Sequence, residues 1–237
     1  MTLDCVVKNT DYIKRSLELG CKNYFTTQHG WAGKFLEAYD LCKQNNLKMV
    51  YGAELYMVKD RTKKDNSNYH VILIAKNQDG FYELNSIMSE SNRSGFYYKP
   101  RIDIELLKQL TPNNFFITSA CVAGFLRPGD DMKELFETVY DHFGKNFFLE
   151  VQNHSFDIQV QHNKNMLLLK QYYNMQLIHA NDSHYIYPEQ AQDRIKFLNG
   201  KGMKYGDEDS FILDFPDYDT IVERYKKQGL WSDSQIK

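Results

Sequence analysis

Short apolar segments that alternate with amphipathic helical segments constrain the fold of this chain more than any other feature. Residues 69–75 have the composition of a buried strand, and a helical pattern follows at 81–90. Residues 23–51 contain a strand, a helix and a second strand, which is a βαβ unit. We expect further strands at 115–118, 147–151 and 176–180, and helices at 10–20, 103–109, 132–143, 157–173, 194–198 and 218–227. This alternation predicts an α/β fold, either a barrel or a doubly wound sheet.

The length of 237 residues suits one domain of barrel size, or one domain plus a short appendage. The strand and helix pattern stops near residue 198. We therefore expect a barrel domain at 1–198 and a C-terminal extension at 199–237. The apolar runs are too short to span a bilayer, and the first residues do not form a signal peptide, so we expect a cytoplasmic protein with no membrane partner.

Charge and cysteine content exclude several classes of protein. Lys and Arg number 29 against 31 Asp and Glu, so a net charge of -2 produces no global attraction to nucleic acid, and any such contact must be local. The four cysteines form no Cys-x-x-Cys pair. This spacing argues against a zinc-finger clip and against a disulfide framework.

The segment from Ile178 to Tyr185 is an apolar strand that runs into a carboxylate and an imidazole. Asp182 and His184 come just after the predicted strand, at the edge where α/β proteins keep their chemistry. They are our first candidates for metal ligands and for catalysis. The alternative is a plain turn in which the backbone satisfies His184.

Other potential ligands also lie close to strand ends. His29, Glu54 and Cys121 each follow a predicted strand, whereas His70 begins one and must point into the barrel to join them; Asp4 lies near the start of the chain. Imidazole, carboxylate and thiolate groups bind zinc and related metals, and their convergence is typical of hydrolases in which metal-bound water is the nucleophile.

Each of these residues also has a simpler interpretation. His29 fits a turn residue, His70 a hydrogen-bonded histidine at the end of a strand, and Cys121 a buried structural thiol. Glu54 fits a surface carboxylate, although a charge within the apolar segment 51–56 is costly unless it is paired.

Taken in order, the motifs resemble the polymerase-and-histidinol-phosphatase (PHP) domain, and most closely the PHP domain of the bacterial replicative DNA polymerase III alpha subunit. The resemblance covers residues 2–225. It rests on Leu3-Asp4, Thr26-Thr27-Gln28-His29, Val50-Tyr51-Gly52-Ala53-Glu54, His70-Val71-Ile72-Leu73, Asn77 to Leu84, Gly95-Phe96-Tyr97 with Lys99-Pro100-Arg101, Ser119-Ala120-Cys121-Val122-Ala123-Gly124 and Asn181-Asp182-Ser183-His184-Tyr185.

The resemblance implies a distorted seven-stranded (β/α) PHP barrel that holds up to three zinc or manganese ions. Some members are metal-dependent phosphoesterases or 3′-5′ exonucleases. Asp4, His29 and His184 resemble the ligands of one metal. Another metal's ligands would be Glu54, His70 and Cys121, and the full carried-over set is Asp4, His29, Glu54, His70, Cys121, Asp182 and His184.

The sequence departs from the family pattern at its start. Members normally begin with a strand ending in His-x-His, which is absent here, so we expect a barrel lacking its first strand and one impaired metal site. Gln28 also stands where the family has Asp. Two strand edges would then be exposed, and we expect either that a preceding segment on a partner chain or neighbouring subunit completes the sheet or that the start has been truncated.

Two functions remain open, and both lie in DNA replication with DNA and polymerase or replisome subunits as partners. The first is a metal-dependent phosphoesterase or 3′-5′ exonuclease. The second is a catalytically inactive scaffold that binds a polymerase or proofreading partner. A small-molecule phosphatase of the histidinol-phosphate type ranks last, and nothing after Asp209 resembles a polymerase palm, so the chain is not a polymerase by itself.

Residues 95–101 are the local segment suited to nucleic acid. Tyr97 could stack on a base, and Lys99 and Arg101 could pair with phosphates of a single strand. The alternative is an ordinary packed loop.

Overall fold

Strands and helices alternate along the chain in a computed structural model that describes residues 5–129, 132–203 and 211–236. The strands are β1 (Asn23–His29), β2 (Lys48–Met57), β3 (Tyr69–Ala75), β4 (Arg101–Ile102), β5 (Phe115–Thr118), β6 (Phe147–Val151) and β7 (Gln176–His179). The helices are α1 (Asn9–Glu18), α2 (Phe35–Gln44), α3 (Gln78–Arg93), α4 (Ile104–Leu107), α5 (Lys133–Phe143), α6 (Asp157–Tyr173), α7 (Ala191–Gly200), α8 (Tyr218–Gln228) and α9 (Asp233–Ile236).

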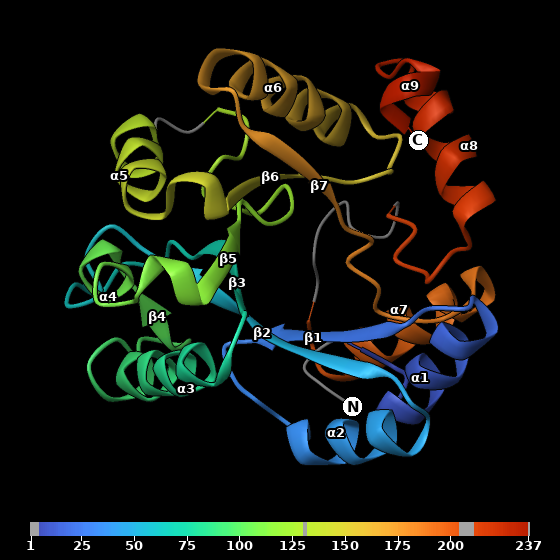
Figure 1. The fold of residues 1–237 in the computed structure, drawn as a ribbon, viewed down its shortest axis with the longest axis horizontal. Coiled ribbons are helices and arrows are strands. Elements are labelled where there is room, and N and C mark those ends of the chain that lie inside the picture. Colours follow the sequence, from blue (N-terminus) through green and yellow to red (C-terminus); the bar gives the residue numbers. More distant parts are fainter. Residues whose placement is uncertain (1–4, 130–131, 204–210, 237) are drawn as a thin grey trace.

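The strands form one mixed sheet in the order β1-β2-β3-β5-β6-β7, with the short β4 paired to β2. Strand β3 runs antiparallel to both β2 and β5, whereas the other neighbouring pairs are parallel. The sheet curls and the helices lie along its outer side (Figure 1). Within the described ranges β1 pairs only with β2 and β7 only with β6. The predicted α/β fold with an incomplete barrel is therefore confirmed.

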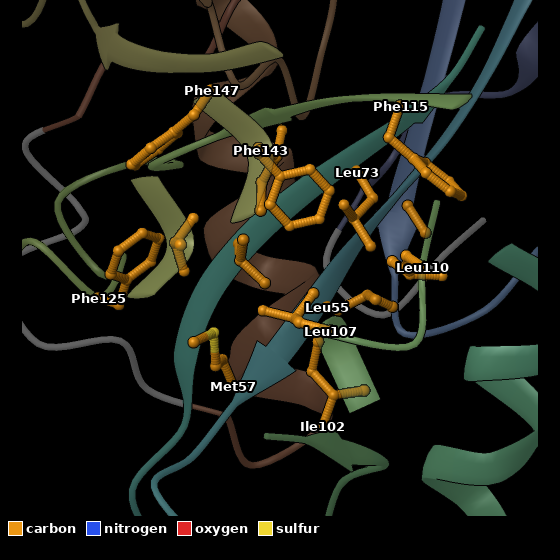
Figure 2. Close-up of a cluster of buried hydrophobic side chains, with 14 of the residues drawn as sticks. Leu55, Met57, Leu73, Ile102, Leu107, Leu110, Phe115, Phe125, Phe143 and Phe147 are labelled. Carbon is orange, nitrogen blue, oxygen red and sulfur yellow. The ribbon is translucent and has the colours of Figure 1, made fainter. Parts of the chain in front are cut away.

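Alternation along the strands separates an apolar outer face from a mixed inner face. Leu55 of β2 and Leu73 of β3 point outward and are fully buried under the helices, as Figure 2 shows. Their neighbours Glu54 and Ile72 point to the concave side and line a cavity. The helical layer thus supplies the core, and the concave side is left for chemistry.

Several element boundaries differ from the sequence prediction. Strand β2 runs on to Met57 rather than ending at residue 51, because β3 pairs with residues 54–57 along their length. Helix α3 begins at Gln78 rather than at residue 81, because the Asn77 side chain accepts a hydrogen bond of 2.8 Å from the Gly80 amide and caps it. The helix expected at 103–109 is only the short α4.

The buried outer face predicts a large difference between two leucine substitutions. Leu73→Ala removes a side chain that is 0% exposed, and should lower the free energy of unfolding by about 2–5 kcal/mol because it leaves a cavity. Leu168→Ala, at a position that is 65% exposed, should change it by less than about 1 kcal/mol. Urea unfolding of both variants measures the difference, and similar losses would contradict this assignment of the core.

Candidate metal centre

Strand pairing brings His29 and Glu54 together. The two residues are direct partners in the parallel register of β1 and β2, so their side chains emerge side by side on the concave face. His29 Nδ1 lies 3.4 Å from Glu54 Oε2. The His29 ring also stacks on the Tyr56 ring, with 5.8 Å between their centroids.

His70 joins them because β3 is antiparallel. The start of β3 lies at the same edge of the sheet as the carboxyl ends of β1 and β2. His70, at the start of its strand, therefore meets His29 and Glu54, which lie toward the ends of theirs. His70 is paired with Tyr56, diagonally across from Glu54, and its Nδ1 lies 2.5 Å from Glu54 Oε1.

The trio has the size of a metal site. One potential ligand atom from each of His29, Glu54 and His70 lies within 4.8 Å of the others. Two ligands bound about 2.1 Å from one ion are at most about 4.2 Å apart. Shifts of a few tenths of an ångström would therefore let one ion replace the direct contacts between these side chains.

The electrostatics of the trio also suit a cation. Burial alone would raise the pKa of the Glu54 carboxyl, but the charges of His29 and His70 outweigh it and hold that pKa well below its usual range. Burial would lower the pKa of His70, yet the Glu54 charge and hydrogen bond raise it. A buried carboxylate here is thus compensated by positive charge, which a proton or a metal ion can supply.

Cys121 approaches the trio from the loop after β5. Its Sγ lies 3.6 Å from His70 Nδ1. The loop turns sharply through Ala120, which has φ +57°, and through Gly124, where a Cβ would lie 2.0 Å from the Ser119 carbonyl. Burial, and then the charges of Asp182 and Glu54, raise the pKa of the thiol well above its ordinary value. Without a metal the group is therefore a neutral thiol.

Asp182 and His184 lie on the loop after β7 and face the same cavity as His29 and Glu54. This cavity has a volume of about 520 Å³. The His184 ring lies 6.4 Å from the His29 ring, and its Nδ1 is 2.7 Å from the Asp182 carbonyl oxygen. That hydrogen bond fixes the tautomer with its lone pair on Nε2. Asp4 lies outside the described residues.

Comparison with known protein families shows to which family the chain belongs. The PHP domain profile matches residues 1–154. The chain belongs to the PHP domain family.

Curated relatives place the chain near one branch of that family. It is 32% identical over 227 residues to the DNA polymerase III subunit alpha of Borreliella burgdorferi, covering 90% of this chain and 20% of that protein. The same subunit of Aquifex aeolicus is 31% identical over 204 residues, covering 79% of this chain and 18% of the relative. The chain thus spans about a fifth of the length of these relatives.

A solved structure supports the fold. A protein from Bifidobacterium adolescentis, named for a proposed metal-dependent phosphoesterase activity, superposes with a TM-score of 0.53 at 10% identity, covering 94% of this chain and 92% of that one. In the described part of this PHP domain no helix is both long and apolar enough to cross a membrane.

The aromatic and basic loop of the PHP domain is more tightly built than its sequence suggests. Arg101 is only 2% exposed, and its guanidinium donates to the backbone carbonyls of Gly95, Asp65 and Arg61. Tyr97 packs against that guanidinium, 5.3 Å from the ring centroid. Arg101 therefore holds the loop together from the inside, and little of its side chain is exposed for the phosphate contact expected from the sequence.

Lys99 has a different position. Its Nζ lies 4.2 Å from the centre of the Tyr56 ring, which in turn stacks on His29. The neighbouring Phe96 and Tyr98 are 60% and 78% exposed. One cation thus stands beside the candidate metal centre, and two exposed aromatic rings lie on the same loop.

Glu150 is a site residue that the sequence analysis missed. It lies on β6, lines the cavity and is 2% exposed. Thr118 Oγ1 donates to it at 2.6 Å and Gln152 Nε2 at 3.2 Å. Burial, reinforced by the Asp182 charge, raises its pKa to about 7. The sequence held a signal for Glu150, because it is a lone charge in the apolar run Phe147–Val151, as Glu54 is in the apolar segment 51–56.

The raised pKa predicts a pH-dependent stability. Glu150 binds its proton more tightly in the folded than in the unfolded chain, so its stabilising effect is complete below about pH 4.5 and is lost as the pH rises through about 7. In the presence of a chelator, wild-type protein should lose on the order of 3 kcal/mol of unfolding free energy between pH 4.5 and 8 relative to Glu150→Gln. Urea unfolding at several pH values measures this. Glu105→Gln, at an exposed site, should follow the wild-type profile, and parallel profiles for all three proteins would contradict the assignment.

Proposed function

We propose that this PHP domain is a metal-dependent phosphodiester hydrolase of the DNA polymerase III alpha type that acts in DNA replication, with 3′-5′ exonuclease activity as its specific form. The observation that carries the proposal is the trio of His29, the buried Glu54 and His70, beside a cavity that also holds Asp182 and His184. Similarity to polymerase alpha subunits supports the replication context.

The donor set fits zinc or manganese. Imidazole and carboxylate groups suit both ions, and a thiol within reach, Cys121, favours zinc. The resemblance groups His29 with Asp4 and His184, but the His29 ring lies beside Glu54. We therefore propose His29, Glu54 and His70, with Cys121 within reach, as one ligand set, and Asp4, Asp182 and His184 as the remainder, for one to three ions with one site impaired. When bound, such an ion supplies a nucleophile by lowering the pKa of water and offsets the charge of the phosphate.

The chain's own groups have distinct proposed roles. Asp182 and His184 act beside the reacting phosphate, and Nε2 is the His184 atom that would bind the ion there, because Nδ1 is hydrogen-bonded to the Asp182 carbonyl. Lys99 contributes a positive charge near His29, and Tyr97, with the exposed Tyr98, offers a surface for a base. DNA is the proposed substrate.

A second function, an inactive scaffold, is favoured by the open sheet. Phe25 of β1 and Ile178 of β7 lie on the concave face at the two ends of the sheet and are 55% and 36% exposed. An extended segment could pair with either strand and cover these side chains. We propose that a preceding segment on a partner chain, or a neighbouring polymerase or replisome subunit, supplies it.

Hydrolysis assays on metal-loaded protein distinguish the two functions. We expect wild-type protein with manganese or zinc to cleave bis(p-nitrophenyl) phosphate and 3′-ended single-stranded DNA, and a chelator to abolish the reaction. Glu54→Gln should lower the rate by about 100-fold or more, because it removes the central ligand. Glu105→Gln, an exposed carboxylate on α4, serves as the matched control.

Equal rates for wild type and Glu54→Gln, or a rate that a chelator does not change, would contradict hydrolysis at this centre. Protein that holds metal but cleaves neither substrate would favour the scaffold.

A further inference from the structure

The loop that carries Asp182 and His184 is held by the C-terminal extension. Two sets of hydrogen bonds join them, one made by the α8 side chains directly and one through residues 211–217, which precede α8. These contacts link residues far apart in the sequence, and neither set involves a proposed metal ligand side chain.

The first set centres on Tyr225 of α8. Its hydroxyl donates to the Val151 carbonyl at 3.1 Å and lies 2.7 Å from His179 Nδ1. His179 ends β7, and its Nε2 lies 2.8 Å from Asn181 Oδ1, one residue before Asp182. Tyr225 is only 6% exposed, and its ring packs against Trp231. One hydroxyl thus ties the ends of β6 and β7 to α8.

The second set centres on Arg224. Its guanidinium donates two hydrogen bonds, of 2.6 and 2.8 Å, to the Asp214 carboxylate. The Asp214 carbonyl accepts from Ser183 Oγ at 2.6 Å, and the adjacent Leu213 carbonyl accepts from the His184 amide at 2.8 Å. Arg224 therefore fixes the segment that receives the backbone of the ligand loop.

The loop depends on this support because its backbone adopts an unfavourable conformation at one residue. Asp182 has φ +50°, a left-handed conformation that a non-glycine residue adopts at a cost. On its other side the loop is supported by Tyr12 of α1, whose hydroxyl donates to the Ser183 carbonyl at 2.7 Å. The loop is thus clamped between α1 and α8, and its conformation is not determined by its sequence alone.

We propose that α8 is a clamp whose residues Tyr225 and Arg224 position Asp182 and His184 for the metal, so that metal binding and α8 docking strengthen each other. The inference rests on the proposed function only for the identity of the ligand. Thermodynamic linkage makes the effect reciprocal: a clamp that favours the metal is itself stabilised when metal binds.

Tyr225→Phe tests the clamp with little change in packing, because it keeps the ring and removes the hydroxyl. Zinc affinity should fall about 3- to 10-fold, the effect of losing one or two hydrogen bonds that hold a ligand loop. Arg224→Lys should act in the same direction, because lysine keeps the charge but cannot make the two parallel bonds. Tyr218→Phe, on the same helix at a side chain that is 59% exposed, is the matched control and should bind as wild type does.

Two measurements read the result. Competition with a chromophoric chelator gives zinc affinity, and hydrogen exchange gives the protection of the loop amides. In metal-free protein, the His184 and Tyr185 amides should exchange faster in Tyr225→Phe and Arg224→Lys than in wild type, and added zinc should slow exchange in α8 of the wild type.

Unchanged affinity and unchanged loop exchange in both folded variants would overturn the proposal, as would an equal effect of Tyr218→Phe. If wild-type protein binds no zinc or manganese, the proposed function and the coupling both fail. The loop exchange then decides separately whether α8 holds the loop: faster exchange supports the clamp and unchanged exchange overturns it.

Discussion

The compensation of the Glu54 charge is the constraint on which the rest of this structure depends. The carboxylate is 5% exposed in the middle of a strand whose other face is core. A buried charge is tolerated only beside an opposite charge. The register of β1 places His29 beside the carboxylate, and the reversed direction of β3 brings His70, whose pKa the Glu54 charge raises, into direct contact with it. The mixed topology of the sheet is therefore what brings the proposed metal ligands together at its edge.

Local patterns were sufficient to predict the fold class. The apolar runs and helical stripes identified the strands, and the residues near their predicted ends include His29, Glu54 and Cys121, which lie at one edge of the sheet, although Glu54 falls within β2 because that strand runs on to Met57. The direction of β3 could not be read from its own seven residues, because an apolar run looks the same in a parallel and an antiparallel strand.

Long-range contacts account for what the sequence did not reveal. Arg101 looked like a surface cation, but it donates to three carbonyl groups of residues up to 40 positions away. The link from Tyr225 to His179 spans 46 positions, and the charged helix that carries Tyr225 has no motif that predicts it. Glu150 is the exception, because its charge lies in an apolar strand and could have been recognised by the reasoning that singled out Glu54.

The central claim is that His29, Glu54 and His70 bind one metal ion. The most direct measurement is anomalous X-ray scattering at the zinc edge from crystals grown with zinc. We predict a peak between these three side chains, about 2.0–2.2 Å from an imidazole nitrogen of each histidine and from a Glu54 carboxylate oxygen. A map without a peak there, with the Glu54 carboxylate still in direct contact with His70, would contradict the account.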